Sequence, residues 1–318
     1  MSSELCRIVV AEAADGRRAD AVLAQALGVS RTEAATRLEE GLVRREAAAG
    51  GGPSPGRTVK KSEKLGAGEV LLAERPTRTD PLEVKVEIVE GLHILHQDRD
   101  VVVVDKPVGV AAHPSPGWTG PTVVGGLLGA GVEIATSGAQ ERRGIVHRLD
   151  VGTSGVMVVA KTERAYSLLK DAFRDRTPTK TYRALVQGLP DPVDGTVDAP
   201  IGRHPGHDWR FAVVESGRDA RTHYRLLEAY GRASLMDVRL ETGRTHQIRV
   251  HFSALGHPCA GDLTYGADPH LAAELGLTRQ WLHAAELSID HPGTGDRVTF
   301  AADLPPDLSG ALSILEDG

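Results

Sequence analysis

The stretch GIVHRLDVGTSGVMVVAKT, residues 144–162, contains groups that could do chemistry. One carboxylate, Asp150, lies between Arg148 and a turn of small residues, and an apolar run follows. Loops held by rigid strands are where catalytic groups are usually placed, and such a carboxylate can act as a nucleophile, a general base or a metal ligand. An Asp that caps its own turn has the same local pattern. The tetrapeptide alone therefore leaves both interpretations open.

A second motif, TGRTHQIRVH at residues 242–251, supplies an arginine. Its apolar residues recur at i, i+4 and i+7, which predicts a helix that follows Gly243 and ends at Gly256. On that helix His246 and Arg249 would share a face beside the buried stripe. A partly buried guanidinium requires an anion because it stays protonated. Asp150 is the predicted counter-ion, and a solvated arginine on the helix surface is the alternative.

A third fragment, KTYR at residues 180–183, opens a predicted strand. Tyr182 could stack on a nucleobase and also use its hydroxyl. A tyrosine in a strand also fits ordinary core or surface packing, so this fragment has weight only beside the other two.

These motifs need elements to hold them. Apolar and β-branched runs predict strands at residues 84–89, 101–104, 155–160, 180–186, 222–227 and 234–240. Helices are predicted at residues 122–128 and 163–174, and the second must end before Pro178. The sequence contains neither a Gly-x-Gly-x-x-Gly fingerprint nor a Walker phosphate loop, which disfavours a nucleotide cofactor.

The first 75 residues form a separate pattern. Helical periodicity over residues 18–27 is followed by Ser30 and Glu33 in the spacing of a capping box, which predicts two helices joined by a tight turn. A short strand is predicted at residues 69–73, after the loose insert AAAGGGPSPG at residues 47–56. We expect a front module (1–75), a linker (76–83), a catalytic domain (84–310) and a tail (311–318).

Composition sets further limits. The chain has 318 residues, two cysteines and a net charge of −6, but residues 141–183 hold ten Lys or Arg against five Asp or Glu. Local fields decide where phosphates bind, so this +5 segment predicts contact with a polyanion, although a solvated helix face has the same composition. The cysteine count, the absence of a signal-peptide pattern and the short apolar runs predict a cytoplasmic protein without a membrane span.

The thirteen histidines do not predict a metal site. His246 and His251 would lie about 140° apart around a helix and so do not converge. His204 and His207 lie in a loop without a companion cysteine cluster. A glycosidase would need two facing carboxylates, whereas here one Asp is expected to face an Arg.

Taken together, HRLDVGTSG, KTYRALV and LETGRTHQIRVH resemble the active-site motifs of the RluA/RluD family of RNA pseudouridine synthases. The resemblance covers residues 84–304 and includes VDKPVGVAAHPSPG at residues 104–117. It implies an α+β catalytic domain, with a mixed and mostly antiparallel sheet, that isomerises uridine in RNA without a cofactor or metal. By this likeness Asp150 is the catalytic aspartate, Tyr182 the active-site tyrosine and Arg249 the partner of the aspartate.

The resemblance also implies that the target uridine is extruded from its stack. Arg148 would then fill the vacated space, and the small residues of the turn would let the backbone approach the nucleotide. The predicted substrate-binding residues are His147, Arg148, Thr153, Ser154, Gly155, Lys180, Arg244 and His246.

The front module resembles the S4 RNA-binding domain, in which two helices and a small sheet present basic side chains. The predicted RNA-binding residues are Arg31, Arg37, Arg44, Lys60 and Lys61 in this module and Lys170, Arg174 and Arg176 in the catalytic domain. Large-subunit ribosomal RNA, or a pre-ribosomal particle, is the expected partner of a monomeric enzyme. Transfer RNA is the alternative substrate, and a non-catalytic RNA-binding assembly factor is the alternative class of protein.

Overall fold

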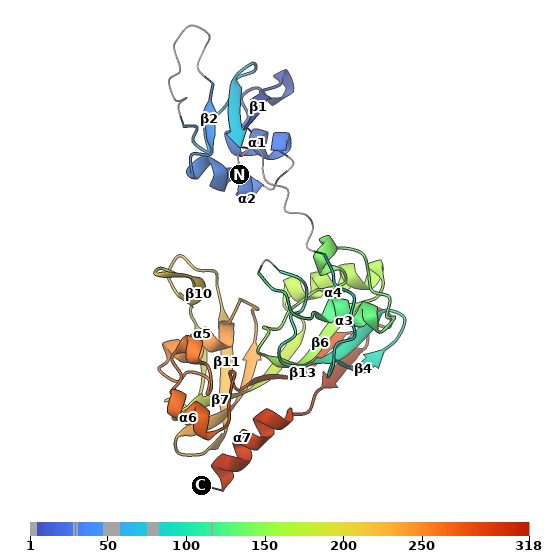
Figure 1. Cartoon of the computed structure of the whole chain (residues 1–318), viewed down its shortest axis with the longest axis vertical. Coiled ribbons are helices and arrows are strands. Elements are labelled where there is room, and N and C mark those ends of the chain that lie inside the picture. Colours follow the sequence, from blue (N-terminus) through green and yellow to red (C-terminus); the bar gives the residue numbers. More distant parts are fainter. Residues whose placement is uncertain are drawn as a thin grey trace. The chain divides into compact units, whose positions relative to one another are not determined.

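The structure, a computed structural model, describes residues 5–27, 29, 31–46, 58–74, 83–115 and 117–317 (Figure 1). The chain divides into two compact units, Met1–Asp80 and Pro81–Gly318. The predicted cap residue Ser30, the insert at 47–56 and most of the linker at 76–83 lie outside the described residues.

In the described part of the small unit, two α-helices lie on a three-stranded sheet. Its elements are β1 (Leu5–Val9), the short helix η1 (Glu12–Ala14), α1 (Ala19–Leu27), α2 (Arg31–Glu39), β2 (Val43–Arg45) and β3 (Val70–Glu74). The strands pair antiparallel in the order β1-β3-β2. Val22 and Leu23 of α1, Leu38 of α2 and Leu71 of β3 share one core, as the helical periodicity predicts.

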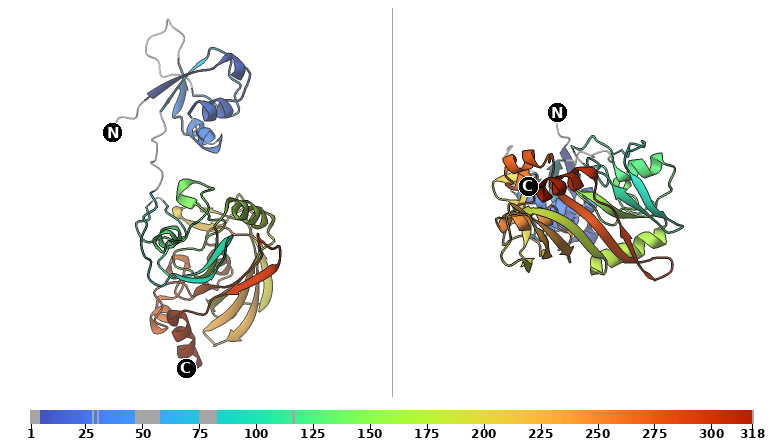
Figure 2. Two further views of the ribbon diagram at one scale, coloured as in Figure 1. Left: turned by 90° about the vertical axis from the view of Figure 1, so that its right-hand side faces the viewer. Right: turned by 90° about the horizontal axis from the view of Figure 1, so that it is seen from below.

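The large unit is built on a single mixed sheet (Figures 1 and 2). Among the described residues its strands run in the order β4-β5-β6-β13-β7-β12-β11-β8, and β14 pairs with β13. Their bounds are β4 (His93–Gln97), β5 (Val101–Lys106), β6 (Ser154–Ala160), β7 (Thr179–Gln187), β8 (Asp194–Asp198), β11 (Arg221–Ala229), β12 (Ala233–Leu240), β13 (Leu282–Asp290) and β14 (Arg297–Ala301). Strands β6 and β13 pair parallel and the other neighbours antiparallel, which confirms the predicted α+β class.

Helices cover both faces of this sheet. They are α3 (Val123–Gly129), α4 (Glu163–Asp175), α5 (Gln247–Ala254), α6 (Pro269–Glu274) and α7 (Pro306–Glu316), with the short helices η2 (Gln140–Arg142) and η3 (Leu263–Tyr265). Helices α3 and α5 share a core with Tyr182 of β7, whereas α4 packs on the opposite side of β5 and β6. A separate hairpin of β9 (Ile201–His204) and β10 (His207–Val213) contacts α5.

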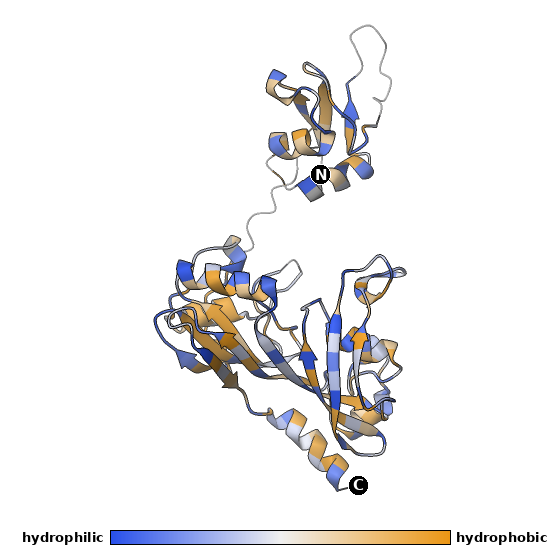
Figure 3. Ribbon diagram, turned by 180° about the vertical axis from the view of Figure 1, so that it is seen from behind, coloured by the Kyte–Doolittle hydropathy of each residue, from blue (hydrophilic) through white to orange (hydrophobic). Residues whose placement is uncertain are grey.

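The run of four valines at 101–104 explains why β5 lies inside the sheet. Val102 and Val104 enter the core under α3, and Val101 and Val103 enter the core under α4. A strand buried on both faces needs a continuous apolar run rather than alternation. The corresponding part of the sheet is coloured largely as hydrophobic in Figure 3.

The strand predicted at residues 84–89 is wrong, because these residues form no strand. Their backbone runs instead against the glycines of α3, where the amide of Glu87 donates to the carbonyl of Gly125. A Cβ on Gly125 would lie 2.2 Å from the carbonyl oxygen of Lys85. Val84 and Val89 pack against the core that contains α3, whereas Val86 and Ile88 are exposed. The apolar alternation in this segment therefore does not mark a strand, and the glycines of α3 let its backbone approach the helix.

The predicted tail at 311–318 is also corrected. Helix α7 crosses that boundary, and its Leu308 and Ala311 are buried with Trp281 in one core. Strands β1, β2, β4, β8, β9, β10, β13 and β14 and helices α6 and α7 were not predicted from the sequence. No helix among the described residues is long and apolar enough to cross a membrane.

Gly155 marks the tightest approach between β6 and β13. Its φ is +115°, and a Cβ there would lie 2.1 Å from the carbonyl oxygen of Ala284. We expect Gly155→Ala to lower the free energy of unfolding of the large unit by about 3 kcal/mol, because it adds both backbone strain and a clash. Urea unfolding followed by tryptophan fluorescence measures this, since all three tryptophans lie in the large unit.

Gly131→Ala is the matched control, since Gly131 has a φ of +74° with open space around its Cβ position. It should cost about 1 kcal/mol, the strain of the left-handed backbone alone. Equal losses in the two variants would contradict the close approach at Gly155.

Candidate active site

Asp150 lies in the turn that leads into β6. The turn is closed by the amide of Thr153, which donates to the carbonyl of Asp150 at 3.0 Å, and the amide of Gly109 donates to the carbonyl of Val151 at 2.9 Å. The Asp150 side chain is 18% exposed. A rigid turn at the start of a buried strand therefore holds a carboxylate that reaches both the protein interior and a pocket.

Tyr182 reaches the same pocket from β7. Side chains alternate along a strand, so Tyr182 shares its face with Ala184 and Val186 and points toward the core that includes α5. In the sheet register Gly155 is opposite Ala284, and Ala284 is opposite Tyr182, so Tyr182 lies two strands from the Asp150 turn. Burial, and then the nearby charge of Asp150, raise the pKa of the Tyr182 phenol, which keeps it protonated.

Arg249 enters from α5 and faces Asp150. Its Nη1 lies 3.6 Å from Asp150 Oδ2, which is an ion pair without a direct hydrogen bond. The guanidinium also lies 4.8 Å from the centre of the Tyr265 ring. Three motifs far apart in the sequence thus meet at one pocket, as predicted.

The principal partner of Arg249 is Asp262, which the sequence analysis did not identify. Nε and Nη2 of Arg249 donate to the two oxygens of Asp262 at 2.6 and 2.9 Å, and the Asp262 side chain is only 1% exposed. Burial alone would lower the pKa of Arg249, but the hydrogen bonds and charge of Asp262, with a contribution from Asp150, raise it. The expectation that Asp150 is the principal counter-ion is therefore corrected: it is the second of two. The sequence signal for this pairing was an isolated acid, Asp262, within the apolar stretch CAGDLTY, together with an arginine expected to be buried.

The helix that holds Arg249 begins later than predicted. His246 has a φ of +57° and caps α5, so residues 244–246 belong to the preceding turn and His246 is not on a helical face. Gln247 fixes this turn: its side-chain oxygen accepts from the Thr242 hydroxyl and the Arg244 amide, and its nitrogen donates to the Arg221 carbonyl.

His246 nevertheless lies at the site. Its Nδ1 is 2.7 Å from the Tyr265 hydroxyl, and its Nε2 is 3.9 Å from Asp150 Oδ2. Burial lowers the pKa of His246, against the opposing effect of Asp150, so the imidazole is held neutral near pH 7. Beneath the turn, burial also lowers the pKa of Lys106 to about 7, although Asp150 opposes this, and its Nζ donates to the Pro107 and Val110 carbonyls.

The pocket around Asp150 has a volume of about 540 Å³, part of which is open to solvent. Four of the predicted substrate-binding residues line it: Arg148, Thr153, Arg244 and His246. Leu149, Leu240, Ile248 and Leu282 supply apolar walls. Apolar walls combined with convergent polar and charged groups are typical of a small-molecule or nucleotide site.

His147 does not line this pocket. Its ring stacks on Phe173 with centroids 4.5 Å apart, and its Nε2 accepts from the amide of Val158 at 3.0 Å. Burial and the charge of Lys180 lower the pKa of His147 to about 3. His147 therefore supports β6 as a neutral acceptor, which corrects its predicted role in substrate binding.

Ser154, Gly155 and Lys180 are also absent from the pocket lining. Ser154 is 2% exposed and hydrogen bonds to His283, and Gly155 allows β13 rather than a nucleotide to approach. Burial and Arg176 lower the pKa of Lys180 to about 8. Ser154 and Gly155 therefore serve strand packing, and their spacing in the sequence could not distinguish this role from contact with a ligand.

The predicted RNA-binding cations differ in their surroundings. Arg44, Lys60, Lys170 and Arg176 are exposed. Arg31 pairs with Asp20 at 3.2 Å, Lys61 with Glu39 at 2.6 Å, and Arg174 with Asp171 and Asp175. Arg37 is half-buried. The local positive field is thus weaker around the paired residues than their count suggests.

One cluster of metal-type ligands occurs in the described part of the chain, formed by His96, Asp98 and His291. None of the three lines the Asp150 pocket. Nε2 of both histidines approaches Asp98 Oδ2, at 3.0 Å from His96 and 2.7 Å from His291. The amides of Gly293 and Thr294 donate to Nδ1 of His291. This leaves the proton of the neutral ring on Nε2, where it donates to Asp98 instead of facing a cation.

The arrangement at the pocket is one carboxylate beside a permanent cation, a protonated phenol and a neutral imidazole. Similarity to known proteins identifies the family to which this arrangement belongs. Residues 100–254 match the family model described as RNA pseudouridylate synthase. A Mycobacterium bovis protein named "Uncharacterized RNA pseudouridine synthase Mb1567" is 58% identical over 94% of this chain and 94% of its own.

The chain belongs to the RNA pseudouridine synthase family. The "Ribosomal large subunit pseudouridine synthase D" of Xanthomonas campestris is 39% identical over all of this chain and 94% of its own length. The solved structure of "Human RNA Pseudouridylate Synthase Domain Containing 1" is 30% identical, has a TM-score of 0.56, and covers 71% of this chain and 90% of its own. The RluA/RluD resemblance is thereby confirmed, and this RNA pseudouridine synthase is an isomerase that acts on uridine in RNA.

The pair Arg249–Asp262 allows stability and catalysis to be separated. Arg249→Met leaves the buried Asp262 without its partner and should cost about 3–5 kcal/mol of unfolding free energy. Adding Asp262→Leu should recover most of this loss, because an apolar pair of similar volume replaces a buried ion pair at little cost. Urea unfolding and a pseudouridine assay measure the two effects.

The double variant should remain inactive, because Asp150 still lacks its cation. Arg232→Met is the control, since Arg232 and Glu274 form an exposed pair that contributes about 1 kcal/mol or less. Full activity in the stable double variant would exclude Arg249 from the chemistry.

The neutral state of His147 predicts a pH dependence. Its folded-state pKa of about 3 lies below the ordinary value of about 6.5, so the unfolded chain binds a proton that the folded chain does not. The stability from this group is complete above about pH 6.5 and falls as the pH drops toward 3. His147→Gln cannot titrate, so wild type should lose about 2 kcal/mol more than this variant between about pH 7 and pH 5. Parallel stability curves for the two proteins would contradict this role.

Proposed function

We propose that Asp150, Tyr182 and Arg249 carry the isomerisation in this chain. The reaction breaks the N1–C1′ bond of a uridine, turns the uracil and forms a C5–C1′ bond. C5 loses its proton, N1 gains one, and no electron enters or leaves, so the reaction needs no redox cofactor. The observation that carries the proposal is the meeting of an ionisable carboxylate, a buried guanidinium and a buried phenol at one pocket.

Each of the three groups has a physical task. Arg249 places a fixed positive charge 3.6 Å from the Asp150 carboxylate and limits its orientation, since Asp262 already fixes two of the guanidinium nitrogens. The protonated Tyr182 offers an aromatic face and a hydroxyl to the uracil. Apolar walls reduce the access of water, which would otherwise hydrolyse the opened glycosidic bond.

The pocket rim supplies the groups for binding an extruded nucleotide. Arg148 is exposed beside Asp150 and is suited to fill the space left by the base or to neutralise a phosphate. Thr153, Arg244 and His246 complete the polar lining. Lys170 and Arg176, both exposed, would contact the phosphate backbone beyond the pocket.

We further propose large-subunit ribosomal RNA as the substrate, acted on by a monomer in the cytoplasm. Relatives from Nitrosomonas europaea and Xanthomonas campestris, at 45% and 39% identity, are named as ribosomal large subunit synthases. The small unit, with two helices on a three-stranded sheet, supports an S4-like RNA-binding module. Its exposed Arg44 and Lys60 are the foremost candidates for phosphate contact.

Asp150→Asn tests the catalytic assignment. The variant keeps the shape of the side chain but not its charge, so RNA affinity should change by less than about threefold while turnover falls by about a thousandfold or more. Tritium placed at C5 of the uridines of a large-subunit ribosomal RNA transcript is released when pseudouridine forms. Glu286→Gln, a β13 residue that does not line the pocket, is the control and should keep full activity.

Pseudouridine mapping in cells that lack the protein tests the substrate. Loss of modification at sites in large-subunit ribosomal RNA supports the proposal. Loss confined to transfer RNA would replace it with the alternative substrate, and an active Asp150→Asn protein would overturn the catalytic assignment.

A further inference from the structure

Three hydrogen bonds hold the turn that contains Asp150. Three successive carbonyls are each occupied: that of Asp150 by the Thr153 amide, that of Val151 by the Gly109 amide, and that of Gly152 by a side chain, Arg279 Nη1, at 3.1 Å. The first bond lies within the turn, and the second comes from the loop after β5. The third comes from a residue that does not line the pocket.

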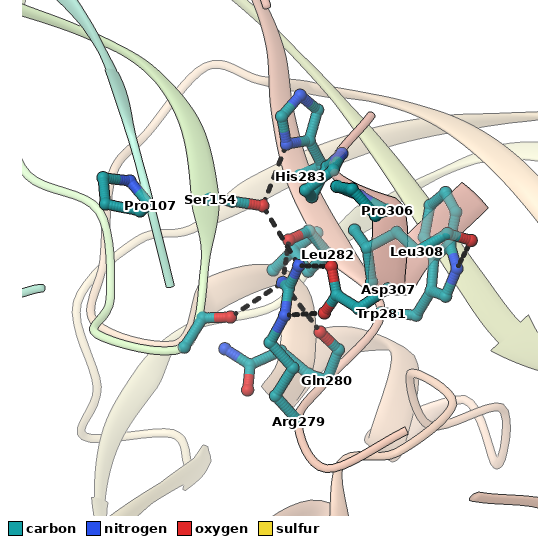
Figure 4. Close-up of polar contacts among 12 residues, drawn as sticks. Pro107, Ser154, Arg279, Gln280, Trp281, Leu282, His283, Pro306, Asp307 and Leu308 are labelled. Carbon is teal, nitrogen blue, oxygen red and sulfur yellow. Dashed lines mark hydrogen bonds and ion pairs between the residues drawn. The ribbon is translucent and has the colours of Figure 1, made fainter. Parts of the chain in front are cut away.

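Arg279 is buried at the centre of a network drawn in Figure 4. Its Nε and Nη2 donate to the two oxygens of Asp307 at 2.7 and 3.0 Å. Its Nη2 also lies 3.3 Å from Ser154 Oγ, and its Nη1 faces the Leu282 carbonyl at 3.3 Å. One guanidinium thus joins the Asp150 turn, the start of β6, the start of β13 and the first turn of α7.

The neighbouring residue presses on the same turn. Gln280 Nε2 donates to Thr153 Oγ1 at 3.2 Å, and a Cβ on Gly152 would lie 2.6 Å from Gln280 Oε1. Gln280 therefore packs closely against the turn on the side of residues 279–280, and the bond from Arg279 opposes movement of the turn away from them. A carbonyl two residues from Asp150, in a turn closed on Asp150 itself, is suited to fix the direction of the carboxylate.

We propose that Arg279 is a positioning residue for the reaction: gripped by Asp307 of α7, it holds the Gly152 carbonyl and thereby aims Asp150 at the nucleotide. This inference rests on the proposed catalytic role of Asp150. A displacement of a reacting group by about 1 Å can cost about a hundredfold in rate, so the support of the turn affects turnover as well as stability. Helix α7 then belongs functionally to the site although it contributes no residue to the pocket.

The test compares three variants of the full chain. Arg279→Lys keeps a positive charge but cannot bond Asp307 and Gly152 together. Asp307→Asn keeps one acceptor and is the milder change should Arg279→Lys fold poorly. Trp281→Phe is the matched control, because it removes the bond from Trp281 Nε1 to the Leu308 carbonyl, which also fastens α7, without touching the turn.

Single-turnover tritium release and RNA affinity are measured at a temperature where every variant is folded. We expect Arg279→Lys to lower the rate by about tenfold or more, with RNA affinity changed by less than about twofold. Asp307→Asn should lower the rate by about threefold. Trp281→Phe should retain the wild-type rate, even if its melting temperature falls by as much as that of the two network variants.

Hydrogen exchange at the Thr153 amide gives a second measure that does not depend on activity. It should rise in Arg279→Lys and Asp307→Asn and stay unchanged in Trp281→Phe. The inference would be overturned if Arg279→Lys and Asp307→Asn both showed wild-type reaction rates and wild-type exchange. It would also be overturned if the loss of rate followed the fall in melting temperature in all three variants. An inactive wild type would instead count against the proposed function, while the exchange data still decide whether Arg279 holds the turn.

Discussion

A buried guanidinium between two carboxylates is the interaction on which the site depends. Arg249 cannot lose its charge, and its position inside the protein is tolerable because Asp262 satisfies it with two short hydrogen bonds. The remaining nitrogen faces Asp150 at 3.6 Å. The stable pair with Asp262 thus fixes the position of Arg249, and the guanidinium presents a positive charge to Asp150, the carboxylate proposed to carry the reaction.

The sheet explains how the other groups reach this cation. The parallel pairing of β6 with β13, beside the antiparallel pairing of β13 with β7, brings the start of β6 within two strands of Tyr182. Gly155 makes the first of these pairings close enough, since β13 occupies the space of its missing side chain. On the same face, α5 covers the end of the sheet and brings Arg249 to the pocket. Arg279 and Asp307 of α7 lie outside the pocket, and their bonds support the turn that holds Asp150.

Much of this organisation could be predicted from local sequence. The valine run at 101–104 indicates a strand buried on both faces. The apolar spacing over residues 18–27 and the capping-box pattern after it indicate the two helices of the small unit. The three motifs around Asp150, Tyr182 and Arg249 identify one family and one pocket. These patterns can be recognised from the sequence because each depends on the types of residues that lie close together along the chain.

Pairings between distant segments could not be derived in this way. Asp262 as the principal partner of Arg249, and the different uses of His147 and Thr153 within a single motif, depend on which strands lie side by side. The hold of Arg279 on Gly152 spans 127 positions. Residue type and periodicity predict the kind of partner that a side chain requires, namely an anion, a hydrogen-bond donor or an apolar surface to pack against. Which of many equivalent partners meets that need is settled by the folded chain, because hydrogen bonds and burial act through distance in space.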